Sequence, residues 1–141
     1  MPLRFDLPPF DKLYIGKSII LNSHERAFFV IEGETPVLKS KDVLLVDRAV
    51  SAIEKLYYTV QQIYLEDGFD KYQGTYFALT VQAVSEDPST YAVIDESDAL
   101  VRNREFYKAL KNLKKLIKAD LFRVDRSEPG AYVRRPLRGA V

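Results

Sequence analysis

The chain holds few side chains that could carry out chemistry on a substrate. Its sole histidine, His24, lies in a polar stretch beside Glu25 and Arg26, and there is no cysteine. A serine or threonine nucleophile needs a positioned base, so carboxylates and lysines are the only catalytic groups left. The run Gly16-Lys17-Ser18 matches only the end of a phosphate-binding loop and lacks the earlier glycine of that motif. We therefore expect a protein that is not an enzyme and that uses no cofactor or metal.

Basic and aromatic side chains in the first 41 residues are of the types that bind RNA. Lysine and arginine contact phosphates, and aromatic rings or guanidinium planes stack on unpaired bases. A turn that carries His24 and Arg26 could present both to one looped-out base. The alternative is that Tyr14 belongs to the core and that the cations keep the protein soluble. The candidate RNA-binding residues are Lys12, Tyr14, Lys17, His24, Arg26, Lys39 and Lys41.

Basic residues gather in the carboxyl-terminal third, although the net charge of the chain is only +1. Four lysines there recur at steps of three and four residues, which places them on one face of a helix. Such a face is usually solvated, but it could also hold an RNA backbone or an acidic partner. The segment 123–141 is basic and is expected to be flexible. The four lysines are Lys108, Lys111, Lys115 and Lys118.

Tyrosines of the central and later segments favour a protein interface. Adjacent side chains on a helix, such as Tyr57 and Tyr58, cannot both point the same way. A tyrosine ring buries area while its hydroxyl finds a partner, so tyrosine is enriched at interfaces. The alternative is a wide helix buried on most of its surface. The candidate interface residues are Tyr57, Tyr58, Tyr72 and Tyr76.

One amphipathic helix, expected over 50–65, organises the chain. Apolar residues recur there at steps of three and four, while Glu54, Lys55, Gln61 and Gln62 are expected to face water. Either Asp47 or Ser51 can cap its start, and Gly68 is expected to follow its end. We expect this helix to pack against both the strands before it and the helices after it.

The remaining elements predict an α+β fold. Alternation and turn residues indicate strands at 3–7, 12–15, 18–21, 27–31 and 37–38, which should form an antiparallel sheet or small barrel-like meander. Helical stripes follow over 72–83, 89–99 and 106–117, with Asn103 as the expected cap of the last. The expected domains are a strand sub-domain at 1–45, a bundle of three or four helices at 46–122 packed on it, and a tail at 123–141.

We expect neither a secretion signal nor a membrane-spanning segment in this chain. Its first ten residues contain one arginine and no long apolar run. No segment approaches the roughly 20 apolar residues that span a bilayer. We expect a cytoplasmic protein without membrane contact.

Four segments of the chain form an ordered set. They are DKLYIGKSII at 11–20, VLKSKDVL at 37–44, LYYTVQQIYL at 56–65 and FYKALKNLKKLI at 106–117. Together they resemble the FlbT family, bacterial regulators of flagellin synthesis, over residues 3–120. The resemblance implies a repressor that binds the 5′ leader of flagellin mRNA and promotes degradation of that mRNA. The alternative is a flagellar assembly adaptor that contacts flagellin or a secretion factor without binding RNA. Association with a second copy is compatible with both.

Overall fold

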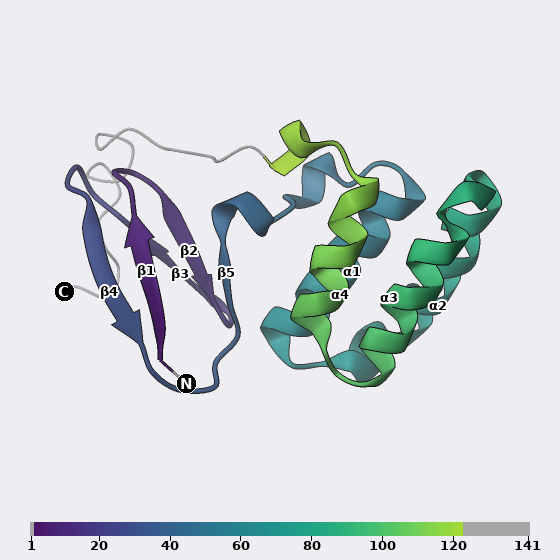
Figure 1. Ribbon diagram of the computed structural model, residues 1–141, viewed down its shortest axis with the longest axis horizontal. Helices are drawn as coiled ribbons and strands as arrows, with labels where there is room; N and C mark the ends of the chain where they lie inside the picture. Colours follow the sequence, from purple (N-terminus) through teal and green to yellow (C-terminus); the bar gives the residue numbers. More distant parts are fainter. Residues whose placement is uncertain (1, 123–141) are drawn as a thin grey trace. The chain divides into compact units, whose positions relative to one another are not determined.

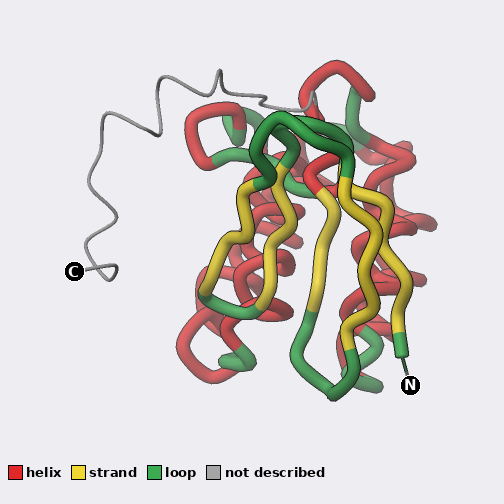
Figure 2. The backbone as a smooth tube through the Cα atoms, turned by 90° about the vertical axis from the view of Figure 1, so that its left-hand side faces the viewer, coloured by secondary structure: helices red, strands yellow, loops and turns green. Residues whose placement is uncertain are grey.

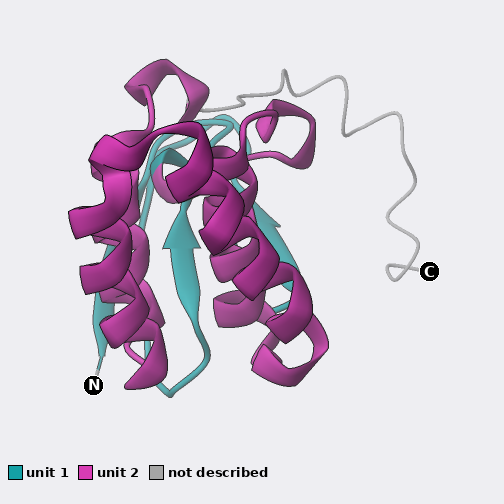
Figure 3. Ribbon diagram, turned by 90° about the vertical axis from the view of Figure 1, so that its right-hand side faces the viewer, with its two compact units in different colours: residues 1–41, 124–141 teal, residues 42–123 magenta. Residues whose placement is uncertain are grey.

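The protein is an α+β molecule, as its sequence predicts. The computed structural model describes residues 2–122, in which five strands precede four α-helices (Figure 1). These residues form two compact units, which we call the strand unit (2–41) and the helical unit (42–122) (Figure 3). The expected packing of the helical part on the strands stays a prediction. The expected flexible tail lies outside the described residues.

The five strands lie where the sequence predicts them, and only the last is one residue longer than expected. They are β1 (Leu3–Leu7), β2 (Lys12–Ile15), β3 (Ser18–Leu21), β4 (Ala27–Ile31) and β5 (Val37–Lys39).

The strands form two antiparallel sheets instead of one continuous meander. β1 pairs with β4, so that Leu7 lies opposite Ala27, and β2 lies between β3 and β5. Pro8 and Pro9 directly follow β1. Because a proline has no N–H to donate to a ladder, β1 cannot turn back through them into a tight hairpin with β2.

The two sheets of the strand unit share one core. Leu13 of β2 is fully buried, and Val37 of β5 and Leu7 of β1 are nearly so. Phe5 joins them, and its ring centre lies 5.9 Å from that of the half-buried Phe29. Both sheets therefore have one inner face fixed by apolar contacts, and the side chains between these positions point outward.

The helical unit contains the number of helices that the sequence predicts. The chain first passes through two short 3-10 turns, Ser40–Asp42 and Val46–Arg48. The helices are α1 (Ala52–Glu66), α2 (Phe69–Glu86), α3 (Tyr91–Arg102) and α4 (Phe106–Leu113).

The ends of α1 follow ordinary capping chemistry. The Ser51 side chain accepts a hydrogen bond from the N–H of Glu54, and the Glu54 carboxylate accepts one from the N–H of Ser51. This is a capping box, and it confirms Ser51 as one of the two expected caps. The helix ends at Asp67, which has a left-handed backbone (φ 52°), and Gly68 instead precedes α2. A short polar side chain tolerates this conformation better than most.

Three local expectations were wrong. Gln61 does not face water: it is 2% exposed, because its amide bonds to the backbone of Leu44. Asn103 does not cap the last helix, because it ends α3 and the next residue, Arg104, turns the chain with φ 60°. The last helix is also shorter than its apolar stripe suggests, since 3-10 turns at Lys114–Leu116 and Ala119–Phe122 replace its final turns.

No helix within residues 2–122 has both the length and the apolar character needed to cross a membrane.

Candidate nucleic-acid interface

The outer face of the β1–β4 sheet carries exposed apolar side chains among charged ones. The register places Arg4 opposite Val30 and Asp6 opposite Phe28, so all four share the face turned away from the core. Phe28 is 74% exposed and Val30 is 52% exposed. An aromatic ring this open, held on a sheet, offers its face for stacking.

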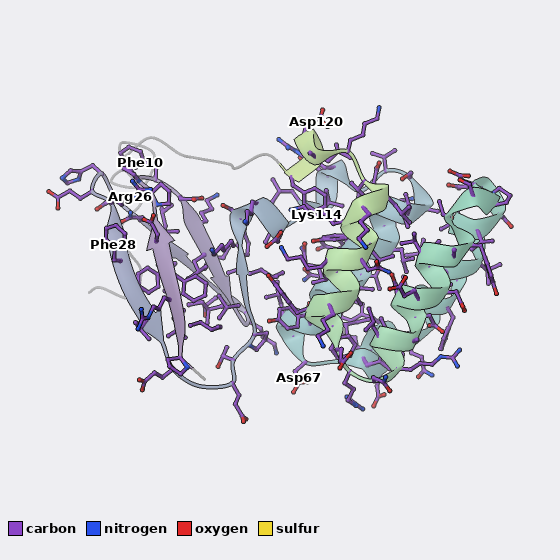
Figure 4. The ribbon with its side chains drawn as sticks, in the orientation of Figure 1. Phe10, Arg26, Phe28, Asp67, Lys114 and Asp120 are labelled. Carbon is purple, nitrogen blue, oxygen red and sulfur yellow. The ribbon has the colours of Figure 1, made fainter. Side chains whose placement is uncertain are left out.

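Arg26 lies beside Phe28, immediately before β4. Its guanidinium carbon is 5.9 Å from the centre of the Phe28 ring, within range of a cation–π contact. Its Nε donates to Oδ1 of Asp6 at 2.7 Å, and both of these side chains are largely exposed. Figure 4 shows Arg26 and Phe28 side by side in the strand unit. A hollow of about 330 Å³ adjoins the pair and is lined by Arg4, Phe5, Asp6, Phe28, Phe29 and Val30.

Asn22 holds the loop that presents Arg26. Its Nδ2 donates to the backbone oxygen of Leu7 at 2.8 Å and to that of Glu25 at 2.7 Å. These bonds tie the loop after β3 to the end of β1. The guanidinium of Arg26 is therefore presented by a loop with defined backbone contacts.

Most of the sequence-derived RNA candidates lie at the same end of the strands as Arg26. The register places Lys39 beside Leu13, one residue from Lys12, and the Ser40 hydroxyl donates to Asp11. The loops that join the strands at this end run next to one another (Figure 2). The candidates at this end are Lys12, His24, Arg26, Lys39 and Lys41.

Two candidates lie elsewhere. Lys17 is exposed in the turn between β2 and β3, at the opposite end of the strands. Tyr14 is half-buried in the middle of β2, where it lies opposite Ile19 and Leu38. The structure does not bring either residue to Arg26.

Phe28 was not foreseen from the sequence. It lies beside Phe29 in an apolar run, and such a run gives no sign of which ring is buried. The exposure of Phe28 follows from β1 instead. Arg4 and Asp6 lie on the outer face of that strand, and the register places Phe28 opposite Asp6 on the same face. Predicting that Phe28 is exposed therefore requires the pairing of β1 with β4, which are distant in the sequence.

The basic face expected on α4 is partly occupied by a buried carboxylate. The side chain of Asp42 is 5% exposed, and its carboxylate accepts hydrogen bonds from Lys111 at 3.1 Å and from Lys114 at 2.8 Å. Burial opposes ionisation of Asp42, but the hydrogen bonds and charges of the two lysines outweigh it and hold its pKa below the usual value. Lys115 also bonds within the unit, to Asn112 at 3.0 Å.

Burial removes two tyrosines from the candidate protein interface. Tyr57 is 1% exposed and donates its hydroxyl to the backbone oxygen of Asp42 at 2.6 Å. Tyr76 is 3% exposed and donates to Asp98 at 2.6 Å. Burial raises the pKa of both hydroxyls. Tyr58 and Tyr72 are half-buried and stay candidates.

The helical unit has its own hollow, of about 250 Å³. Three phenylalanine rings and a valine make much of its lining apolar, and two arginines also line it. Arg102 pairs with Asp98 at 2.8 Å, and Phe77 is 44% exposed. The lining residues are Phe69, Tyr76, Phe77, Asp98, Val101, Arg102, Arg104 and Phe106. In residues 2–122 we find no group of three or more side chains of the types that could hold a metal ion.

Comparison with known proteins decides the family. A family model described as "Flagellar protein FlbT" matches residues 3–121. The chain belongs to the FlbT family. This confirms the resemblance carried by the four sequence segments, and the FlbT match ends before the basic tail. No solved structure matches the chain.

Relatives of the FlbT family cover most of the chain. A probable flagellum biosynthesis repressor protein FlbT of Rhodopseudomonas palustris is 35% identical over 120 residues, which is 85% of this chain and 95% of the relative. One from Bradyrhizobium diazoefficiens is 33% identical, covering 83% of this chain and 81% of the relative. The flagellum biosynthesis repressor protein FlbT of Caulobacter vibrioides is 27% identical, covering 83% of this chain and 85% of the relative.

Proposed function

We propose that this protein is a cytoplasmic, post-transcriptional repressor of flagellin synthesis. It binds the 5′ leader of flagellin mRNA and promotes degradation of that mRNA. The names of its relatives support the repressor role, because they are called flagellum biosynthesis repressors. The observation that carries RNA binding is the exposed Phe28 ring with the Arg26 guanidinium beside it.

Phe28 and Arg26 have the two chemistries that single-stranded RNA requires. An unpaired base stacks on the open face of the Phe28 ring, and its neighbouring phosphate pairs with Arg26 or with Arg4 on the same sheet face. The ion pair between Arg26 and Asp6 does not prevent this. An exposed pair of this kind is worth only about 0–1 kcal/mol, so a phosphate can displace the carboxylate.

The other cations extend this site along the loop end of the strand unit. Lys12, Lys39 and Lys41 lie at that end and can follow the RNA backbone away from the stacked base. The exposed Glu25 lies in the Arg26 loop and opposes a polyanion. Binding should therefore be strongest in a leader that places an unpaired base beside Phe28 and phosphates on both sides of it.

A titration of labelled flagellin leader RNA at several salt concentrations tests the proposal. Affinity should fall as salt rises, because each phosphate contact releases counterions. Charge reversal of Arg26 together with Lys41 should weaken binding and reduce the salt dependence, while Lys55→Glu on α1 serves as a control outside the strand unit. Glu25→Gln should strengthen binding. Absence of binding even at low salt, or equal loss in the control, would contradict RNA binding.

The second candidate function is that of a flagellar assembly adaptor that contacts flagellin or a secretion factor. The apolar hollow beside Phe77, which Arg102 and Arg104 also line, favours it. Such a hollow suits an apolar side chain that has a carboxylate next to it.

Variants of the two units distinguish the candidates. Phe77→Ala should leave leader RNA binding unchanged if the strand unit carries the function. If changes at Phe77, Tyr58 or Tyr72 instead abolish repression together with a protein complex, while Phe28→Ala has no effect, the adaptor role is correct.

A further inference from the structure

The outer edge of β3 carries apolar side chains on both faces. Ile19 is 56% exposed and Ile20 is 41% exposed, and the strand Ser18–Leu21 contains no charged residue. Within residues 2–122, β3 has β2 as its single neighbour and ends the three-stranded sheet. Edge strands that stay unpaired usually carry charges, a proline or a bulge, because a bare apolar edge recruits other strands. β3 is only four residues long, but none of the four is charged or a proline, and its pairing with β2 has no bulge.

One hydrogen bond fixes which backbone groups of β3 face β2. The N–H of Asn22 donates to the backbone oxygen of Asp11 at 2.9 Å, across the hairpin. Backbone groups of successive residues in a strand point to alternate sides. Ile20 therefore also faces β2, whereas Ile19 and Leu21 turn their N–H and C=O groups to the outer edge.

The turn of the hairpin gives the same assignment independently. Gly16, with φ 54°, donates its N–H to the backbone oxygen of Pro36 at 2.8 Å, toward β5. Its neighbour Ile15 must then face β3, where it lies opposite Ser18. Counting from Ser18, alternation again places the backbone groups of Ile19 at the outer edge.

We propose that this edge pairs with the same edge of a second copy of the chain. The two β3 strands run antiparallel about a two-fold axis through Ile20, and the two three-stranded sheets become one sheet of six. Ile19 of each copy exchanges both backbone hydrogen bonds with Leu21 of the other. This homodimer does not depend on RNA binding and goes beyond the proposed function.

The side chains select this register from those that the backbone allows. With Ile20 opposite its own copy, Ile19 lies opposite Leu21 on the other face, so every cross-strand pair at the centre is aliphatic. Moving the axis to Ile19 places Lys17 opposite Leu21. Moving it to Leu21 places Ser23 opposite Ile19. Both shifts leave an aliphatic side chain beside a polar one, and only the register centred on Ile20 avoids this.

Cross-linking tests the register, because the natural chain has no cysteine. Ile20→Cys should form a disulfide-linked dimer on mild oxidation, since directly opposite residues of a non-hydrogen-bonded pair lie about 4.5 Å apart between Cα atoms. Ile19→Cys is the matched control. Its two copies would be offset by two residues along the strands, beyond the roughly 7 Å between Cα atoms that a disulfide spans.

Sedimentation over a concentration series extending to about 1 mM tests the dimer itself. The natural chain should approach twice the monomer mass, and Ile20→Lys should remain monomeric with an unchanged circular dichroism spectrum. Val81→Lys, at a still more exposed apolar site on α2, should dimerise normally. A natural chain that stays monomeric throughout would overturn the proposal, as would equal cross-linking of the two cysteine variants or dimerisation of Ile20→Lys.

Discussion

The side chain of Gln61 pairs with both backbone polar groups of Leu44. The Leu44 N–H donates to Oε1 of Gln61 at 2.8 Å, and Nε2 of Gln61 donates back to the Leu44 oxygen at 3.1 Å. Leu44 is fully buried, so neither group could be satisfied by water. The Gln61 amide on α1 thus satisfies both backbone groups of Leu44, as a neighbouring β-strand would.

Gln61→Leu should therefore destabilise the protein much more than its small change in volume suggests. Two buried backbone groups would lose their partners, at a cost of about 2 to 4 kcal/mol. Urea denaturation measures the change in the free energy of unfolding. Gln62→Leu, at the adjacent half-buried position, should cost less than about 1 kcal/mol, and equal effects at the two positions would refute the role assigned to Gln61.

Asp42 should make stability fall in acid. Its folded-state pKa lies below its unfolded-state value, which is near 3.8, because Lys114 and Lys111 favour the carboxylate. The unfolded chain therefore binds a proton more readily, and the stabilisation present above about pH 4 is lost as pH falls through the folded-state pKa.

Comparing denaturation midpoints at pH 7 and at pH 3 checks this prediction. Asp42→Asn should lower stability at pH 7 and should shrink the difference between the two pH values. Glu54 and Glu66 also have lowered pKa values, so part of the acid sensitivity should remain in the variant. An undiminished pH dependence in Asp42→Asn would show that the ion pairs of Asp42 contribute nothing.

Ser51→Ala should remove one half of the capping box of α1. The N–H of Glu54 would lose its partner, and loss of such a cap costs about 1 kcal/mol. Thermal or urea unfolding would measure the loss. Ser51→Asp retains an acceptor at the cap and should keep most of the stability of the natural chain. If Ser51→Asp is as unstable as Ser51→Ala, the cap does not contribute to stability.

Asn22→Ala should loosen the loop that presents Arg26. Its side chain satisfies backbone oxygens on two segments, so its loss should cost about 1 to 3 kcal/mol of stability. It should also weaken leader RNA binding at temperatures where the protein remains folded, because Arg26 would lose its fixed position. Unchanged RNA affinity in a folded Asn22→Ala variant would show that the loop contacts of Asn22 do not contribute to RNA binding.

Sequence patterns located most of the strands and helices but could not give the pairing between distant segments. Alternation located β1, an apolar run located β4, and Ser51 was one of two caps expected at the start of α1. The same reasoning placed Gln61 in water, because a polar residue in a helix is buried only when a distant partner such as Leu44 satisfies it. That partner cannot be read from the helix alone.

The candidate site was predicted in part for the same reason. Arg26 and Lys12 are RNA-binding candidates by residue type, and the structure places both at one end of the strand unit. Phe28 and Asn22 were missed, since their roles follow from the pairing of β1 with β4 and from backbone contacts between loops. Tyr57 and Tyr76 were named as interface candidates from composition, but their hydroxyls find partners inside the helical unit.

The most direct test of the RNA-binding account is an equilibrium titration of fluorescent flagellin leader RNA with the natural chain and Phe28→Ala. Stacking of one base on an aromatic ring contributes about 1–3 kcal/mol, so the variant should bind roughly 5- to 150-fold more weakly. Val81→Ala, another exposed apolar side chain, should bind as the natural chain does. Equal affinities for the natural chain and Phe28→Ala, or no binding by either, would contradict the account.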